Sequence, residues 1–157
     1  MWSGRATHSN DANRSVSLAQ FLPLTRHGAH CVSLQKEIRE ADEAILTQSP
    51  FIQRYGGDLT DFADTAAVIS ELDLVITVDT SVAHLAGALG KPVWILLPHV
   101  ADWRWLQERD DSPWYPSARL FRQRAPGKWL DVIEEVGVAL HAFVESSRQQ
   151  VPQRALA

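Results

Sequence analysis

The middle of the chain carries the clearest pattern of hydrophobic and polar positions. Residues 74–78 are apolar on both faces, which is typical of a strand covered by helices on both sides. Asp79, Thr80 and Ser81 follow directly, and each of these side chains can cap a helix. The next apolar positions have helical spacing and are Val82, Leu85, Ala86 and Leu89.

Gly90 and Pro92 mark the end of this helix, because glycine is favoured just past a helix C-terminus and proline cannot continue the helix. The five residues 93–97 are again all apolar. Strand, helix and strand therefore follow one another with short connections, which predicts a parallel β-α-β crossover.

The flanking segments alternate in the same way. We expect helices over residues 36–45, 61–72 and 129–143, and strands over residues 30–34, 51–55 and 119–122. The alternation predicts an α/β fold with a doubly wound, mostly parallel, Rossmann-like sheet. Residues 1–4 are similar to the end of a strand, so we expect a truncated first strand. We also expect a domain over residues 1–145 and a polar, frayed tail over residues 146–157.

The composition narrows the class of protein. The chain has 157 residues, 45% of them hydrophobic and 22% charged, which suits one soluble domain. A net charge of −4 gives no basic excess for nucleic acid or anionic membranes. The lone Cys31 suits a reducing compartment, and no apolar run approaches the roughly 20 residues of a membrane span. We therefore expect a cytoplasmic protein without a transmembrane segment or a nucleic-acid partner.

The turn at residues 79–81 is the candidate site. Ligands of doubly wound sheets lie at the carboxyl ends of the strands, and the free amides of a helix N-terminus suit a pyrophosphate. Thr80 and Ser81 can donate hydroxyl hydrogen bonds, and His84 lies one turn further on the same side. Asp79 would bind a sugar hydroxyl or tie the turn together. Ordinary helix capping explains the same residues, so the pattern leaves both interpretations open.

Motifs for other chemistries are missing from the sequence. No glycine-rich dinucleotide motif follows a strand, and there is no P-loop. The six histidines lack metal-ligand spacing, and there is no G-x-S-x-G motif. We expect no cofactor and no metal.

A tryptophan-rich segment follows the second apolar strand. Its aromatic side chains could stack on a sugar or base and nearby arginines could neutralise phosphate, or the tryptophans could simply cover a sheet edge or an interdomain face. The residues concerned are Trp103, Trp105, Trp114, Arg104 and Arg119.

Several motifs together resemble one family. The string DTSVAHLAGALGKPVWILLP, then DWRW and SPWYPSARLFRQ, is similar to the carboxy-terminal half of bacterial heptosyltransferase-like (family 9 type) glycosyltransferases, especially of tetratricopeptide-repeat proteins that carry such a domain. WSG, HSNDANRSVSL, SLQKE and DLTDFADTAAVI fit the same pattern. The resemblance covers residues 1–140.

This resemblance implies one half of a GT-B fold, in which the carboxy-terminal Rossmann-like domain holds a nucleotide-diphosphate sugar without a metal. It places Thr80 and Ser81 on the diphosphate, and Asp79 and His84 against the donor phosphate or sugar. It also implies that Arg14 contacts the phosphates, with Lys36 as a weaker candidate, and that Phe62 lines the base pocket. Arg14 and Lys36 could equally be ordinary exposed residues.

The implied reaction is inverting, metal-independent transfer of a hexosyl or heptosyl group. The family's catalytic base comes from an amino-terminal acceptor domain, so we expect a donor-binding piece that has no catalytic residue and is inactive alone, with that domain and possibly tetratricopeptide repeats as partners. A non-catalytic scaffold that uses DWRW and SPWYP as its contact patch is the alternative. A sugar-nucleotide epimerase of the same architecture is a third possibility.

Overall fold

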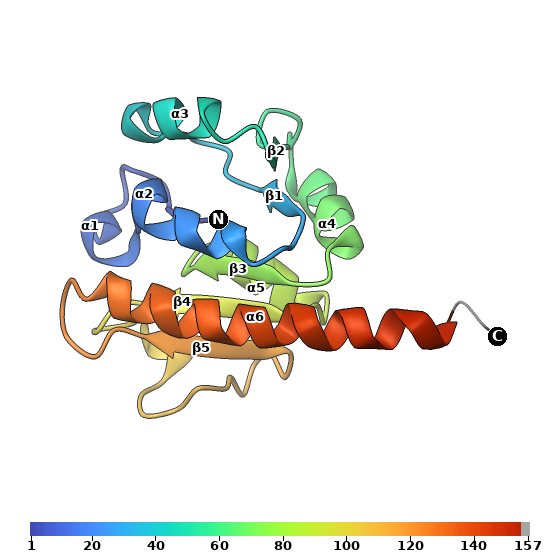
Figure 1. Cartoon of the computed structure of the whole chain (residues 1–157). Helices are drawn as coiled ribbons and strands as arrows, with labels where there is room; N and C mark the ends of the chain where they lie inside the picture. Colours follow the sequence, from blue (N-terminus) through green and yellow to red (C-terminus); the bar gives the residue numbers. More distant parts are fainter. Residues whose placement is uncertain (155–157) are drawn as a thin grey trace.

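The computed structural model describes residues 1–154, and the side chains of residues 1–149. Strands and helices alternate along most of the chain (Figure 1), which confirms the predicted α/β class. In chain order the elements are α1 (Asp11–Arg14), α2 (Leu18–Phe21), the 3-10 helix η1 (Leu22–Arg26), β1 (Cys31–Ser33), α3 (Glu40–Thr47), β2 (Ile52–Arg54), α4 (Phe62–Glu71), β3 (Val75–Val78), α5 (Ser81–Ala88), β4 (Val93–Leu97), the 3-10 helix η2 (Trp103–Trp105), β5 (Ala118–Arg122) and α6 (Trp129–Arg154).

The strands form two parallel sheets, β1-β2 and β3-β4-β5, and residues 1–3 connect them. The Met1 amine donates to the Ile76 carbonyl at 2.8 Å, and the Val78 N–H donates to the Met1 carbonyl at 3.1 Å. On the other side, the Gln35 side chain accepts from the Ser3 N–H at 3.3 Å and donates to the Ser3 carbonyl at 3.1 Å. The resulting order, β2, β1, residues 1–3, β3, β4 and β5, is that of the doubly wound dinucleotide fold.

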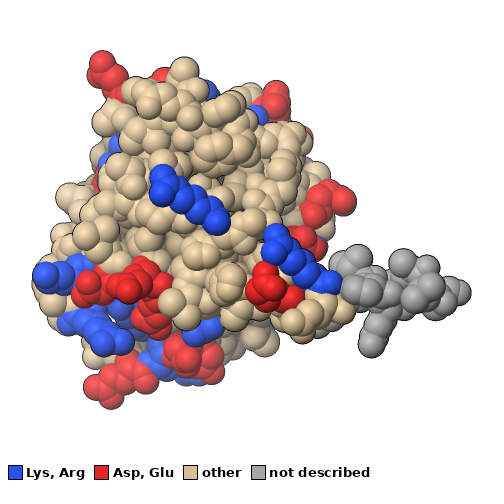
Figure 2. Space-filling view, viewed as in Figure 1, with Lys and Arg blue, Asp and Glu red and all other residues tan. Residues whose placement is uncertain are grey.

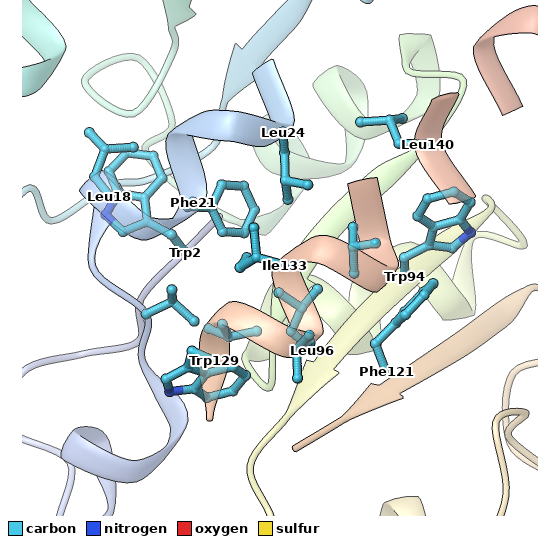
Figure 3. Packing of buried hydrophobic residues seen from close by; sticks show 14 of the residues in the cluster. Trp2, Leu18, Phe21, Leu24, Trp94, Leu96, Phe121, Trp129, Ile133 and Leu140 are labelled. Atoms are coloured by element: carbon cyan, nitrogen blue, oxygen red, sulfur yellow. The ribbon is translucent and has the colours of Figure 1, made fainter. Parts of the chain in front are cut away.

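Helices cover both faces of the sheet, as the two-sided apolar strands predict. On one face Trp94 and Leu96 of β4 pack with α6, α2 and η1 (Figure 3). On the other face Val93, Ile95 and Leu97 pack with α4 and α5. Alternate residues of a strand point to opposite faces, so β4, which is buried along its whole length, supplies both cores.

The expected strands and the helix at residues 61–72 are confirmed to within a residue or two. The start of α3 was predicted wrongly: it begins at Glu40 instead of Lys36. The Gln35 amide donates to the carbonyls of Ser3 and Glu37, at 3.1 and 3.0 Å. The long-range bond to Ser3 and the local bond to Glu37 hold the chain in a loop where local pattern favoured a helix.

The closing helix α6 is longer than expected. It continues through Arg154, so residues 146–154 are helical where a frayed tail was predicted, and residues 155–157 lie outside the described part of the chain. The division of the chain at residue 145 stays a prediction. Within residues 1–154, no helix combines the length and the apolar character needed to cross a bilayer.

Candidate functional site

The N-terminus of α5 lies at the carboxyl end of β3 and is not capped by any side chain. Its N-cap residue, Thr80, has extended backbone angles (φ −144°, ψ 172°), and the first turn contains no acidic residue. Ser81, the first helical residue, is exposed. The first amides of a helix have no partner within the helix, and the helix dipole makes this end positive. This end of α5 can therefore accept an anion.

The N-terminus of α4 shows the opposite arrangement. The Asp61 carboxylate accepts the N–H groups of Ala63 and Asp64 at 2.7 and 3.0 Å, and the Asp64 carboxylate accepts the Thr60 N–H at 2.9 Å. Hydrogen bonds from the Thr60 hydroxyl and amide hold the pKa of Asp64 below its ordinary value. Because its own carboxylates occupy this helix end in a capping box, α4 offers no comparable site for an anion.

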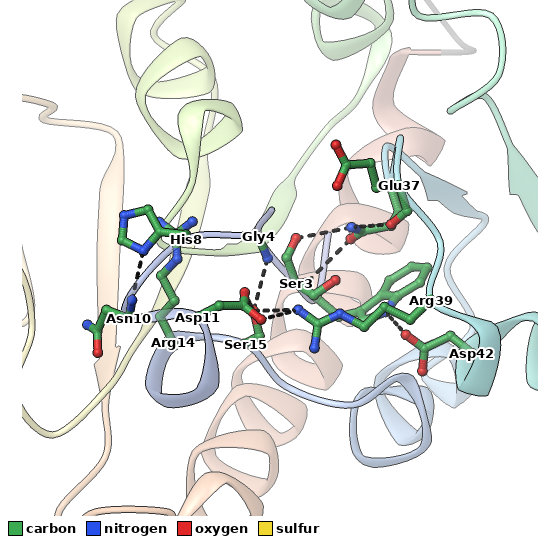
Figure 4. Close-up of polar contacts among 12 residues, drawn as sticks. Ser3, Gly4, His8, Asn10, Asp11, Arg14, Ser15, Glu37, Arg39 and Asp42 are labelled. Carbon is green, nitrogen blue, oxygen red and sulfur yellow. Dashed lines mark hydrogen bonds and ion pairs between the residues drawn. The ribbon is translucent and has the colours of Figure 1, made fainter. Parts of the chain in front are cut away.

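Arg14, the last residue of α1, lies against the turn that leads into α5. Its Nη1 donates to the Asp79 carbonyl at 3.0 Å. Its guanidinium also packs over Gly4 (Figure 4), where an added Cβ would lie 2.5 Å from Nη2. The Arg14 Nε is buried and has no hydrogen-bond partner among the described residues. A positive charge is thus fixed beside the open end of α5 by a main-chain acceptor, which does not neutralise it.

A polar network holds the loop that presents Arg14 (Figure 4). The Asp11 carboxylate accepts from the Ser15 hydroxyl at 2.6 Å and pairs with Arg39 at 2.6 Å. The same Ser15 hydroxyl oxygen accepts the Gly4 N–H at 3.0 Å. Since α1 is only one turn long, these bonds to Gly4 and Arg39 fix its position. Positioning α1 is therefore the structural role of the polar residues in segment 8–18.

Thr80 and Ser81 differ in where their hydroxyls point. The Thr80 side chain is buried, with 7% of the residue exposed, and its hydroxyl lies 3.2 Å from the Thr77 hydroxyl and 3.6 Å from the Met1 sulfur. Ser81 is exposed. The main chain of both residues lies at the open helix end, whereas of the two side chains only that of Ser81 is exposed.

His84, one turn along α5, is held by two aromatic residues from the tryptophan-rich segment. Its Nδ1 lies 3.0 Å from the Tyr115 hydroxyl, and its ring stacks on Trp105 with centroids 5.0 Å apart. Tyr115 packs so closely on α5 that an added Cβ at Gly87 would lie 2.4 Å from its ring. The sequence did not indicate Tyr115, because nothing local links residue 115 to α5.

The three tryptophans of this segment have different roles. Trp105 is fully buried and belongs to the core, as the sheet-covering interpretation predicts. Trp103 and Trp114 are 67% and 56% exposed. The Trp114 indole donates to the Arg104 carbonyl at 2.8 Å, and the Arg104 guanidinium lies 4.7 Å from the centre of the Trp103 ring. Arg104 also pairs with Asp102 at 2.9 Å. Two exposed aromatic rings therefore frame one arginine.

Arg119, the other basic candidate, bridges Asp111 of this segment through its main chain, but its side chain lies elsewhere. It packs over the rings of Phe121 and Trp94, at 4.7 and 5.8 Å, and Trp94 belongs to the core on the α6 face. Arg119 is therefore separate from the aromatic rings around His84, which belong to the opposite face.

Lys36 and Phe62 form a second group at the start of α4. The Lys36 ammonium donates to the Thr60 carbonyl at 3.3 Å and is exposed. Phe62, two residues further along, is the first residue of α4 and is 61% exposed. The structure thus places the predicted residues in two groups on the carboxyl-end side of the sheet: Lys36 and Phe62 at α4, and Arg14, Asp79, Thr80, Ser81 and His84 at α5.

The fold, with its candidate residues at the carboxyl ends of the strands, defines an α/β domain of the doubly wound, Rossmann-like class. Comparison with known proteins adds a similarity to one family over part of the chain. Residues 57–97, from the turn before α4 to the end of β4, match the model of glycosyltransferase family 9 (heptosyltransferase). Protein FlbA of Caulobacter vibrioides is 37% identical over 95 residues, which are 60% of this chain and 16% of FlbA. No solved structure matches significantly. The chain therefore carries a segment similar to family 9, and its match spans a small part of this curated relative.

Proposed function

We propose that this chain binds a nucleoside-diphosphate sugar at the N-terminus of α5, as the donor-binding domain of a glycosyltransferase. The observation that carries the proposal is the uncapped end of α5 beside the guanidinium of Arg14. A diphosphate needs several hydrogen-bond donors and positive charge at one point. The match to family 9 includes α5 and the turn before it, which supports this choice among anionic ligands.

In this proposal the main-chain amides at Ser81 and Val82 bind the diphosphate, and Arg14 adds a charge-assisted hydrogen bond. The Ser81 hydroxyl donates as well, whereas Thr80 contributes its main chain only. In a complete transferase, an acceptor hydroxyl attacks the anomeric carbon with inversion while the bond from that carbon to the diphosphate oxygen breaks. The amides and Arg14 then stabilise the charge of the departing nucleoside diphosphate without a metal.

The remaining residues surround the donor. His84, fixed by Tyr115, lies one turn along α5 on the sugar or phosphate side, and Asp79 accepts a sugar hydroxyl. Phe62 is free to stack on the base because its ring is exposed. Lys36 belongs to the same group of residues at the start of α4. The acceptor hydroxyl and the catalytic base come from an amino-terminal domain, and tetratricopeptide repeats are further partners. The transferred group is a hexose or heptose, and the location is cytoplasmic.

Calorimetric titration with UDP- and ADP-sugars tests this proposal. Arg14→Ala should weaken binding of the preferred donor by about 10- to 100-fold, because a hydrogen bond to a charged group contributes about 1.5–3 kcal/mol. Arg5→Ala is the matched control, since Arg5 is exposed and pairs only loosely with Glu37, at 3.6 Å; its affinity should stay within about twofold of wild type. Equal affinities for the two variants, or no binding of any nucleotide sugar, would contradict the proposal.

The exposed pair Trp103 and Trp114 favours a second candidate, a non-catalytic interaction module. Exposed aromatic rings beside an arginine are typical of protein contact surfaces. This function predicts that UDP- and ADP-sugars leave the melting temperature unchanged, and that Arg14→Ala behaves like wild type in every titration. A donor-dependent rise in melting temperature would exclude it as the sole function.

A further inference from the structure

The two nitrogens of the His84 imidazole lie in different surroundings. Nδ1 lies 3.0 Å from the Tyr115 hydroxyl. Nε2 has no hydrogen-bond partner within the described part of the chain, and unlike the buried Trp105 Nε1 it is not enclosed by the protein. His84 itself is half-buried. One nitrogen is therefore held by a residue of the loop between β4 and β5, and the other is open to a ligand.

The hydrogen bond between His84 and Tyr115 can run in either direction, and its direction decides the chemistry of Nε2. A neutral imidazole carries its proton on one nitrogen and accepts with the other. If the Tyr115 hydroxyl donates to Nδ1, the proton of the imidazole is on Nε2, which can then donate to a phosphate oxygen. If Nδ1 donates to the hydroxyl, Nε2 can only accept, for example from a sugar hydroxyl.

The surroundings of Tyr115 favour donation by its hydroxyl. Within residues 1–149, whose side chains are described, this hydroxyl has no other hydrogen-bond partner. If it accepted from Nδ1, its own proton would have no acceptor in the protein. A phenol is also more acidic than a neutral imidazole N–H, and the imidazole lone pair is more basic than a phenol oxygen. The stronger donor and the stronger acceptor therefore meet when Tyr115 donates to His84.

Aromatic packing holds both rings in place. The Trp105 ring lies almost parallel to the His84 ring, with an interplanar angle of 18° and centroids 5.0 Å apart. Tyr115 packs against α5 at Gly87, where an added Cβ would lie 2.4 Å from its ring. Its ring also contacts Trp105, with centroids 6.3 Å apart. The hydroxyl of Tyr115 is thus fixed relative to Nδ1 by contacts on both sides.

The acidic residue near His84, Asp102, is engaged by another partner. Its carboxylate accepts the Arg104 N–H at 3.0 Å and pairs with the Arg104 guanidinium at 2.9 Å. The N–H bond from Arg104 is the main reason that the pKa of Asp102 lies below its ordinary value, and the charge of nearby His84 contributes less. No hydrogen bond joins Asp102 to His84 within the described residues. Asp102 therefore leaves the choice of protonated nitrogen to Tyr115.

His84 lies on the same side of α5 as the candidate anion site. It is one turn after Thr80 and Ser81, and helical side chains lean toward the N-terminus of their helix. We propose that Tyr115 is a positioning residue for this site: its hydroxyl donates to His84 Nδ1 and so keeps the imidazole proton on Nε2, which donates to a phosphate oxygen of the donor. This inference rests on the proposed function, because the anion at α5 is the proposed donor.

Both charged or polar donors of the α5 site then have neutral partners. Arg14 is held by a main-chain carbonyl, and His84 is held by a phenol. The α6 face differs, because acidic and basic side chains lie beside one another along its margin (Figure 2), and Arg148 of α6 pairs with Glu145 at 2.9 Å. Neutral partners leave the donors at α5 available to an anion.

The tautomer of His84 is measured first, on the chain without ligand. A two-bond ¹H–¹⁵N correlation spectrum is recorded well above the ordinary imidazole pKa of about 6.5, and the His84 signals are assigned by their loss in His84→Ala. We expect the proton on Nε2. In Tyr115→Phe the two tautomers should mix, as in the exposed His30. Adding UDP or ADP, whichever binds, should shift the Nε2 signal of the unaltered chain.

The affinity for the same nucleotide is then measured by calorimetry. Tyr115→Phe should weaken binding by about threefold to tenfold, the range for one hydrogen bond. The same substitution in a His84→Ala background should have no further effect, because Tyr115 acts through His84. Tyr55→Phe is the matched control, since the Tyr55 hydroxyl bonds to Gln53 of the edge strand β2; its affinity should stay within about twofold of wild type.

The other outcomes overturn the inference. A proton on Nδ1 of His84 in the free chain does so whether or not a nucleotide binds. An equal loss from Tyr115→Phe in both backgrounds means that Tyr115 only supports the fold. A shift of Nε2 with a nucleotide sugar, and none with UDP or ADP, assigns His84 to the sugar. If Arg14→Ala weakens binding and Tyr115→Phe does not, the inference fails while the proposed function stands. No binding of any nucleotide or nucleotide sugar contradicts both.

Discussion

Arg14 donates a hydrogen bond of 3.0 Å to the carbonyl oxygen of Asp79, 65 positions further along the chain. This bond joins the loop after residues 1–3 to the turn between β3 and α5. It holds the guanidinium beside the turn that precedes a helix end without a side-chain cap. The carbonyl acceptor is neutral, so Arg14 keeps its positive charge, and in the proposed site it would be oriented before an anion binds.

Gly4→Ala should displace Arg14 without unfolding the domain. The new Cβ would lie 2.5 Å from Arg14 Nη2, and the guanidinium, at the end of a flexible side chain, would move away. We expect donor affinity to fall by about tenfold, the loss of one charge-assisted bond. Gly57→Ala is the control, because its Cβ would have no neighbour within 4 Å. Calorimetry measures the donor affinity, and an unchanged affinity in Gly4→Ala would show that Arg14 does not contact the donor.

Substitutions at Thr80 and Ser81 should affect different properties, the first the stability of the fold and the second the binding of the donor. Thr80→Val removes the buried hydroxyl contact with Thr77, so the free energy of unfolding should fall by about 1 kcal/mol while donor affinity is kept. Ser81→Ala should leave stability nearly unchanged and weaken the donor severalfold. Urea unfolding and calorimetry on the two variants check this, and the reversed pattern would show that the Thr80 hydroxyl binds the ligand.

Gly87→Ala should destabilise the domain by about 1–3 kcal/mol, the usual cost of overpacking. Its Cβ would overlap the Tyr115 ring, which cannot move freely because it contacts His84 and Trp105. Thermal unfolding measures the effect. The double variant Gly87→Ala, Tyr115→Ala should lose less free energy of unfolding than the sum of the losses in the two single variants. Strictly additive losses would mean that residue 87 and the Tyr115 ring do not contact each other.

The Met1 amine should make stability depend on pH. Burial lowers its pKa from 8.0 to about 5, so between these values the unfolded chain binds a proton that the folded chain does not. The free energy of unfolding should therefore rise from pH 5 to pH 8, by at most about 1.4 kcal/mol per pH unit from this group. Urea unfolding of wild-type and N-terminally acetylated protein isolates the effect. Parallel profiles for the two forms would show that the amine is not buried.

Local pattern was sufficient for the central β-α-β unit. Residues 93–97 are apolar at every position, and Gly90, with φ +68°, ends α5 in the backbone conformation that glycine favours. The start of α3 could not be found in this way, since it depends on the bonds of Gln35 to Ser3 and Glu37. The helix signals near residue 36 were real but weaker than these side-chain bonds, of which the one to Ser3 joins distant parts of the chain.

The sequence predicted which residues lie at the candidate site, but it did not predict which way their side chains point. The sequence indicated Thr80 and Ser81 equally, and only packing against Thr77 and Met1 turns one hydroxyl inward. The sequence also could not distinguish buried Trp105 from exposed Trp103, two residues away. That difference arises because Trp105 packs in the core on the α4 and α5 face of the sheet, where its contacts include the ring of His84, far from it in the chain.

The most direct test of the account is an NMR titration of the ¹⁵N-labelled chain with UDP and with ADP. We predict saturable shifts of the Ser81 and Val82 amides with one of these nucleotides. The dissociation constant should increase by about 10- to 100-fold in Arg14→Ala, in proportion to one lost charge-assisted bond, and stay unchanged in Arg5→Ala. No shift at these amides with either nucleotide, or shifts that Arg14→Ala leaves unaltered, would contradict an anion site at the N-terminus of α5.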